Sequence, residues 1–203
     1  MKINDKRKIK KRTLILGVDI DNVILDEISS LKSIYSKNKT PNKEELPINK
    51  IYALHNVWDS VEEYESRLKE WHNSEMFLNL KPIKGSKKAL NKLSRDHDIY
   101  LITARSLFLK DRTLKNLDTH FKGYYKDVHF TGYGEDITLS KAEVCKNLDI
   151  NLFIDDAEEN IIEVSSQGID TLIFDAPWNQ NMKKIKNTKR VYSWEDIVEY
   201  INN

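Results

Sequence analysis

The chain has 203 residues and a formal net charge of +1 at pH 7, although 32% of its residues are charged. This length suits one α/β domain with a modest insertion and is short for two full domains. The balance of charge gives no bulk argument for binding to nucleic acid or to a membrane surface, and no apolar run approaches the length of a membrane span.

The chain begins with a basic arm, residues 1–12, that holds seven Lys or Arg residues and one Asp. We interpret it as a solvated, disordered arm, and contact with a polyanion is the less favoured alternative. No contiguous apolar core of a signal peptide follows it. The single cysteine, Cys145, excludes an intramolecular disulfide and lies in a helical pattern that points it towards the core. We therefore expect a cytoplasmic protein with no membrane partner.

Five short apolar runs rich in β-branched and aromatic residues predict strands, at 13–20, 98–103, 127–132, 151–156 and 170–175. Stretches with a helical pattern lie between and after them, at 85–96, 106–121, 139–148, 157–168 and 193–201. Gly168 stands at the expected C-cap of one helix and Ser193 at the expected N-cap of another. Strands that alternate with helices of this length predict a parallel sheet covered on both faces.

The interval from about 24 to 82 interrupts this alternation, because its pattern is helical and contains no strand. Ligands of open α/β sheets bind at the carboxyl edge of the sheet. An insertion that directly follows the first strand is well placed to cover that edge. We therefore predict a helical cap, 24–82, on a core domain formed by 13–23 and 83–203.

Polar residues gather where the predicted strands end. The first strand carries Asp19 at its end and is followed by Asp21. The second ends on Thr103 and is followed by Ala104 and Arg105, Lys141 opens a helix, and the fourth ends on Asp155 and Asp156. The third strand ends on Thr131, which is less informative. Because the carboxyl ends of parallel strands share one edge, we expect four carboxylates, a hydroxyl and an ammonium in one cleft.

Such crowded carboxylates repel one another, and a divalent cation relieves the repulsion. Mg²⁺ prefers hard oxygen ligands and needs only a few acids besides substrate phosphate. Thr103 and Lys141 suit phosphate oxygens, so the set describes a phosphoryl-transfer site. Asp19 could attack phosphorus, and Asp21 could protonate the departing oxygen and later activate water.

Each element also has a plainer interpretation when it is taken alone. Asp19 and Asp21 could be a turn, Thr103 a strand-end hydroxyl and Lys141 a solvated helix residue. Asp155 and Asp156 could cap the helix that follows them. Their order on successive βα units favours one shared site over four coincidences.

The order Asp19-Ile-Asp21-Asn-Val, Thr103, Lys141 and Asp155-Asp156 resembles the four motifs of the haloacid dehalogenase (HAD) superfamily. The segments FLNLKPIKGSKKALNKL, YLITAR, SKAEVCKNLDINLFIDD, FDAPWNQ and VYSWEDI resemble the 5'(3')-deoxyribonucleotidase (cytosolic type C 5'-nucleotidase) branch and its bacterial and phage relatives. The resemblance spans about residues 13–198. It implies a Rossmannoid three-layer α/β/α fold with a five-stranded parallel sheet and a cap inserted after the first strand.

The resemblance also implies roles for individual residues. Asp19 would be nucleophile and metal ligand, and Asp21 would be general acid/base with its backbone carbonyl on Mg²⁺. Asp155 would complete the metal shell and Asp156 would bind through water or from the second shell. Thr103, Ala104 and Lys141 would bind phosphate.

Substrate choice in such enzymes lies in the cap. The aromatic candidates for stacking on a base are Phe77, Trp58, Trp71, Tyr52 and His55. Phe77 is the best of them, because it occupies the place where the family has an aromatic base-contacting residue, whereas packing inside the cap is the alternative for the others.

The chain departs from the family after Thr103, where Ala104 and Arg105 replace the usual Ser or Pro. Arg105 either reaches phosphate or braces the loop. In the loop after the last predicted strand, Trp178 and Asn179 either pack against the rim of the site or have a purely structural role.

The leading hypothesis is a Mg²⁺-dependent phosphomonoesterase acting on a (deoxy)nucleoside monophosphate. One alternative keeps the chemistry but changes the substrate to another small phosphorylated metabolite or the phosphate end of a nucleic acid. The basic arm slightly favours the nucleic acid, and a large cap opposes it. A non-catalytic nucleotide-binding protein is disfavoured because no catalytic position is substituted. Base, sugar, 5' or 3' phosphate and oligomeric state, a homodimer included, stay open.

Overall fold

The computed structural model describes residues 12–37, 61–132 and 138–203. The six described strands are β1 (Ile15–Val18), β2 (Asp98–Thr103), β3 (Asp127–Phe130), β4 (Leu152–Asp155), β5 (Asp170–Phe174) and β6 (Thr188–Val191). They pair in parallel in the order β3-β2-β1-β4-β5-β6. The parallel sheet predicted from the sequence is confirmed.

The prediction of five strands was wrong by one, because β6 extends the sheet beyond β5. This strand carries Lys189 and Arg190 and buries only Val191. An edge strand has a neighbour on one side alone, so it needs no apolar run. The pattern of apolar runs in the sequence therefore does not reveal β6.

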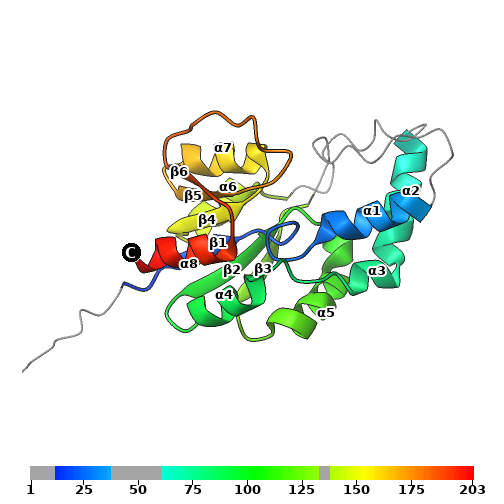
Figure 1. Cartoon of the computed structure of the whole chain (residues 1–203), viewed down its shortest axis with the longest axis horizontal. Helices are drawn as coiled ribbons and strands as arrows, with labels where there is room; N and C mark the ends of the chain where they lie inside the picture. Colours follow the sequence, from blue (N-terminus) through cyan, green and yellow to red (C-terminus); the bar gives the residue numbers. More distant parts are fainter. Residues whose placement is uncertain (1–11, 38–60, 133–137) are drawn as a thin grey trace, which may run out of the picture.

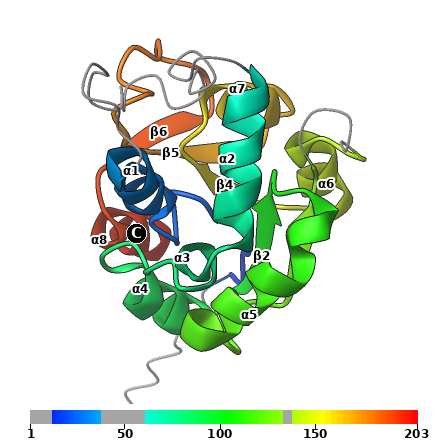
Figure 2. The same cartoon turned by 90° about the vertical axis from the view of Figure 1, so that its right-hand side faces the viewer.

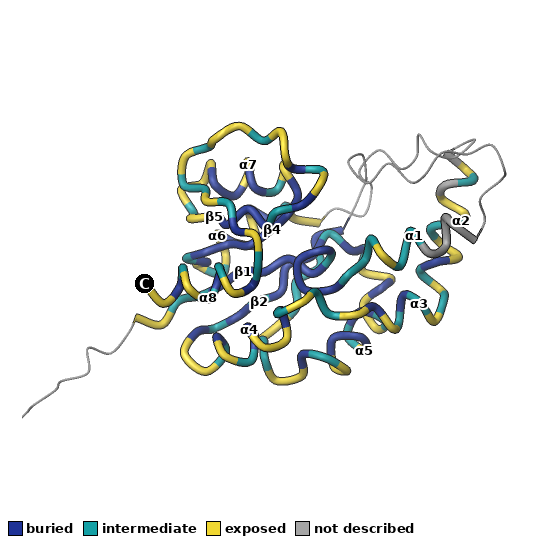
Figure 3. The backbone as a smooth tube through the Cα atoms, viewed as in Figure 1, coloured by how far each residue is buried: buried dark blue, intermediate teal, exposed yellow. Residues whose placement is uncertain are grey.

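Helices cover both faces of the sheet, which gives three layers (Figure 1). One face carries α6 (Lys141–Asn147) and α7 (Glu158–Ser166), and the other carries α4 (Ser86–Leu93), α5 (Lys110–Phe121) and α8 (Trp194–Asn202). A short 3-10 helix, η2 (Leu107–Leu109), precedes α5. The strands are the most deeply buried part of the chain, and the outer sides of the helices are exposed (Figure 3). Within the described residues no helix is long and apolar enough to cross a membrane.

The expected helix caps are present. The side chain of Ser193 accepts a hydrogen bond from the Asp196 backbone N–H at the start of α8. Gly168 has φ 82° after the end of α7, a left-handed conformation that suits glycine. Both positions follow from local chemistry that the sequence displays.

The insertion after β1 begins with α1 (Glu27–Lys37) and returns through α2 (Val61–Asn73) and α3 (Glu75–Leu78). These helices lie beyond the carboxyl edge of the sheet, as Figures 1 and 2 show from two directions. The outgoing and returning segments meet in an antiparallel bridge between Leu25 and Pro82. Residues 38–60 lie outside the described part, so the division into core and cap stays a prediction.

Candidate active site

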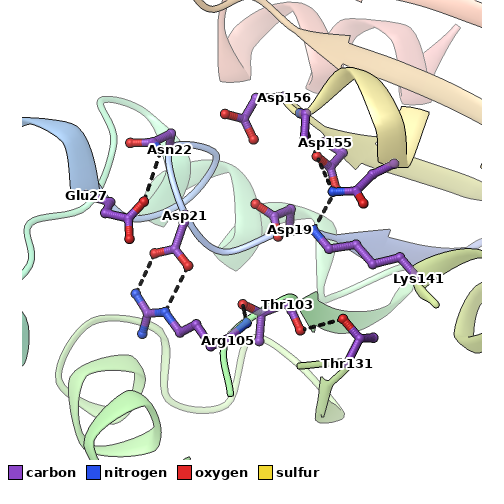
Figure 4. Close-up of polar contacts among 12 residues, drawn as sticks. Asp19, Asp21, Asn22, Glu27, Thr103, Arg105, Thr131, Lys141, Asp155 and Asp156 are labelled. Atoms are coloured by element: carbon purple, nitrogen blue, oxygen red, sulfur yellow. Dashed lines mark hydrogen bonds and ion pairs between the residues drawn. The ribbon is translucent and has the colours of Figure 1, made fainter. Parts of the chain in front are cut away.

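The sheet order brings the predicted site together. Asp19 follows β1, which lies between β2, ending on Thr103, and β4, ending on Asp155. Lys141 opens α6 on the adjacent face, where a capping box between Ser140 and Glu143 defines the start of the helix. Figure 4 shows these side chains converging at the carboxyl edge.

Lys141 lies between two of the acids. Its Nζ is 2.5 Å from Oδ1 of Asp19 and 2.8 Å from Oδ2 of Asp155, and the side chains of all three are buried. Burial alone would lower the pKa of Lys141, but attraction to Asp155 and Asp19 outweighs this and raises it. Burial raises the pKa of Asp19 to about 7, against the opposing pull of Lys141. Because its own pKa is raised, the Lys141 ammonium stays charged at neutral pH.

Asp155 is held by donors besides Lys141. Its Oδ1 accepts the backbone N–H of Ala157 at 2.8 Å, and Asn160 Nδ2 lies 3.3 Å and 3.2 Å from its two oxygens. These contacts hold the carboxylate in place at the end of β4.

The neighbouring Asp156 is held by the loop after β5. Its Oδ2 accepts the indole N–H of Trp178 at 3.0 Å, and its backbone carbonyl accepts Asn179 Nδ2 at 2.9 Å. Asn179 is in turn held by Arg190 of β6, whose Nη1 is 2.6 Å from Asn179 Oδ1. Burial, together with repulsion from Asp155, raises the pKa of Asp156 well above its usual value.

The carboxylates of Asp19, Asp155 and Asp156 form a candidate metal site. One oxygen from each lies within 4.8 Å of the others, and all three residues are buried. Such a set fits a hard divalent cation. The resemblance implied that Asp156 binds through water or from the second shell. Its carboxylate belongs to this cluster, and the way it would bind a metal stays a prediction. The carboxylate of Asp21 is outside this group, and the role of its backbone carbonyl as a metal ligand stays a prediction.

Asp21 instead pairs with Arg105. Arg105 Nη2 lies 2.5 Å from Asp21 Oδ1 and Nε lies 2.9 Å from Oδ2, so the contact is bidentate. Arg105 Nη1 also donates to Thr113 Oγ1 of α5 at 2.9 Å. Burial would lower the pKa of Arg105, but attraction to Asp21 outweighs this and raises it.

Thr103 and its neighbours form the floor of the site. The Thr103 hydroxyl oxygen accepts the Arg105 backbone N–H at 3.2 Å, which leaves the hydroxyl hydrogen for an anion. The Thr103 carbonyl accepts both the backbone N–H and the hydroxyl of Thr131, at 2.8 Å and 3.1 Å. Ala104 lies half-buried in the loop between Thr103 and Arg105.

Sequence reasoning missed Glu27, which lies beside Asp21 (Figure 4). Asn22 has φ 59°, and its side chain accepts the Ile28 backbone N–H at 3.0 Å and donates to Glu27 Oε2 at 3.4 Å. Burial and repulsion from Asp21 raise the pKa of Glu27 to about 8. In the sequence Glu27 resembles an ordinary acid in the first turn of a helix. Its place beside Asp21 follows from the turn at Asn22, which only the structure shows.

The predicted specificity residue, Phe77, is only 1% exposed. Its ring meets Trp71 and His72 edge-on, with centroids 5.0 Å and 5.2 Å away, and the Arg105 guanidinium carbon lies 4.6 Å from its centroid. A base could stack on Phe77 only if these neighbours moved, so its role stays a prediction.

The other aromatic candidates divide into two groups. Trp71 is buried and donates its indole N–H to Ser30 Oγ of α1 at 2.9 Å, as cap packing requires. Tyr52, His55 and Trp58 lie outside the described residues.

Comparison with known proteins decides the family. The family model for "5' nucleotidase, deoxy (Pyrimidine), cytosolic type C protein" matches residues 12–203. The chain belongs to this family. A nucleotidase of Clostridium acetobutylicum is 25% identical over 184 residues, which cover 91% of each chain. A Chlorobaculum tepidum protein provisionally named 5'(3')-deoxyribonucleotidase is 23% identical over 207 residues, covering 95% of this chain and 92% of its own length.

Solved structures of the HAD superfamily share the fold. A haloacid dehalogenase-like hydrolase from Streptococcus pneumoniae matches with a TM-score of 0.66 at 12% identity, covering 93% of this chain and 98% of its own. A Bacillus subtilis protein provisionally called a HAD-hydrolase, solved bound to magnesium, has a TM-score of 0.64 at 18% identity, covering 95% and 100%. The protein is therefore a phosphoric monoester hydrolase of this nucleotidase family, and its fold is that of these HAD structures.

Proposed function

We propose that this nucleotidase-family protein hydrolyses (deoxy)nucleoside monophosphates with Mg²⁺ bound, through an aspartyl-phosphate on Asp19. The observation that carries the proposal is the position of Asp19, which is buried against Lys141 on one side and grouped with two further acids on the other. The names of the curated relatives support a nucleotide as the substrate class.

The residues divide the chemistry as follows. A carboxylate oxygen of Asp19 attacks phosphorus, the ester P–O bond breaks, and Asp21 gives its proton to the departing oxygen. In the second step Asp21 takes a proton from water, the water oxygen attacks phosphorus, and the bond to Asp19 breaks to release inorganic phosphate. Thr103, the Ala104 backbone N–H and Lys141 hold the phosphate oxygens throughout.

Mg²⁺ fits the carboxylates of Asp19, Asp155 and Asp156, with the backbone carbonyl of Asp21 as a further ligand. When bound, the ion supplies positive charge to the substrate phosphate. Lys141 and Arg105 are the cations that contact the acids of this site in the described part of the chain, whereas Asp19, Asp21, Asp155 and Asp156 are four acids. This excess of acidic groups over cations supports a divalent cation.

We further propose that 24–82 acts as the cap that selects the substrate. Its described helices lie over the carboxyl edge where Asp19 and Asp155 end their strands. A cap in that position encloses small substrates better than polymers, which favours a mononucleotide over the phosphate end of a nucleic acid.

The covalent step is tested with Asp19→Asn. We expect this variant to lose hydrolysis and acid-stable phosphorylation while keeping the circular dichroism spectrum of the parent. Asp170→Asn is the matched control, because Asp170 is exposed at the amino end of β5, opposite the carboxyl ends of the strands where the site lies. Appreciable turnover by Asp19→Asn would refute the nucleophile.

The substrate class is tested with one panel, run with Mg²⁺ and with a chelator. It contains 5' and 3' deoxy- and ribonucleoside monophosphates, sugar phosphates and oligonucleotides phosphorylated at either end. We expect the highest kcat/KM on mononucleotides and none in chelator. Equal rates across the panel would refute the nucleotide assignment, and nucleotide binding without hydrolysis would favour a binding protein.

A further inference from the structure

Arg105 lies in the segment after Thr103, where this chain departs from the Ser or Pro that is usual in the family. Its side chain makes more contacts than a residue that only supports the loop would need. Its three guanidinium nitrogens donate to Asp21 after β1 and to Thr113 on α5, and the flat face of the guanidinium lies on the ring of Phe77 on α3. Arg105 itself is only 7% exposed. A guanidinium held on several sides has little freedom to move.

We propose that Arg105 is a positioning residue that fixes the place of the Asp21 side chain, through both oxygens when Asp21 is ionised and through one when it carries the proton, and ties it to the cap through Phe77. This inference rests on the proposed function, in which Asp21 exchanges the proton. It assigns Arg105 no contact with phosphate.

The first argument is that Asp21 needs a restraint. Its side chain is 20% exposed at the edge of the site and precedes Asn22, which turns the chain with φ 59°. Two further acids lie close to it, because Asp19 is two residues before it and the Glu27 side chain lies beside it (Figure 4). A bidentate guanidinium holds the side chain in place among them and also fixes the plane of the carboxylate.

The second argument is a division of labour between the two cations. Lys141 contacts Asp19 and Asp155, whereas Arg105 contacts Asp21 (Figure 4). Within the described residues neither cation contacts the other's acids. Arg105 therefore serves the acid/base, and Lys141 serves the nucleophile and the metal site.

The third argument concerns the cap. The ring of Phe77 covers the guanidinium at 4.6 Å and is itself packed against Trp71 and His72 of α2. A shift of α3 would uncover one face of the guanidinium that holds Asp21. The seating of the cap is thus coupled to the placement of the proton donor.

The test compares two leaving groups in Arg105→Met. A nucleoside monophosphate releases a strongly basic alkoxide that needs a proton, whereas p-nitrophenyl phosphate releases a weakly basic phenolate that does not. We expect kcat/KM to fall about 100-fold for the nucleotide, because a misplaced catalytic group costs about that much, and less than about tenfold for p-nitrophenyl phosphate. Arg105→Lys should recover little, because an ammonium cannot bind both oxygens.

Two further measurements sharpen the result. If Arg105 acts through Asp21, then Arg105→Met should add no further loss for the nucleotide in an Asp21→Asn background. Phe77→Leu should show a smaller loss with the same dependence on leaving group. Arg112→Met is the matched control, because Arg112 also reaches the cap, donating to the Ser74 carbonyl, and should affect both substrates alike.

The outcomes separate the inference from the proposed function. Equal losses on both substrates, or an undiminished loss in the Asp21→Asn background, would overturn the positioning role and indicate direct contact with phosphate. Failure of the parent enzyme to hydrolyse either substrate with Mg²⁺ would instead overturn the proposed function. Melting curves of each variant establish that any loss is measured on folded protein.

Discussion

Lys141→Met removes the ammonium between Asp19 and Asp155 while keeping most of the side-chain volume. The two acids are 5% and 0% exposed, so the variant must bury them without their cation or protonate them. Because the pKa of Asp19 is already raised to about 7, Asp19 takes a proton at little further cost. The Asp155 carboxylate is then left buried without its cation, and we expect this to cost about 4 kcal/mol.

This value is the middle of the range, about 3–5 kcal/mol, that follows removal of one partner from a buried ion pair. For a chain of this length, 1 kcal/mol corresponds to about 2–4 °C in Tm. We therefore expect Lys141→Met to melt about 8–16 °C below the parent at pH 7 in chelator. The deficit should shrink as the pH falls towards 4, because protonation of the acids then becomes less costly.

The assay is thermal unfolding followed by circular dichroism, in chelator and in excess Mg²⁺. The matched control is Lys146→Met, an exposed lysine on the same helix, which should change stability by less than about 0.5 kcal/mol. Mg²⁺ should raise the Tm of Lys141→Met more than that of the parent, because it restores positive charge to the same acids. Equal melting of the two lysine variants in chelator would refute the buried ion pair.

Three further variants test other parts of the site. Trp178→Phe removes the donor to Asp156 Oδ2 and should weaken Mg²⁺ binding about tenfold; an unchanged Kd in calorimetry would contradict this role. Asn22→Ala should lower the free energy of unfolding in urea by about 2 kcal/mol, because it removes the acceptor of the Ile28 N–H and places alanine in a left-handed conformation. Asn22→Gly removes the same acceptor without that strain and should lose only about half as much. Equal losses in the two variants would exclude the backbone contribution. Burial and Arg105 lower the pKa of His72 from 6.5 to about 4, so the folded protein loses stability as the pH falls through that window. His72→Gln should remove part of this loss between pH 7 and pH 4.5, about 3 kcal/mol at most, and parallel losses in both proteins would refute the assignment.

The strands and the site residues at their ends could be predicted from the sequence, because both follow from short patterns of consecutive residues. Apolar runs ending on Asp19, Thr103 and Asp155 specify three buried strands and the acids or hydroxyl that follow them. β6 was not readable, because an edge strand that buries only Val191 has no apolar signature.

The ion pairs of the site could not be predicted in this way. Arg105 and Asp21 are 84 positions apart, and Lys141 and Asp19 are 122 apart, so no local pattern joins them. The sequence left Arg105 as either a phosphate ligand or a brace. Its partner became known only when β1 and β2 were placed side by side.

By itself, the sequence determined the parallel α/β fold, the family and the identity of the residues at the carboxyl edge. These follow from periodicity, from residue types at strand ends and from motif order, all of which are local properties of the chain. Only the tertiary structure decided that Lys141 contacts Asp19 and Asp155, that Asp156 lies in one cluster of buried carboxylates with them, and that Phe77 packs on Arg105. Those outcomes depend on strand order and burial, because they join side chains that are distant in sequence and become neighbours only when the sheet forms.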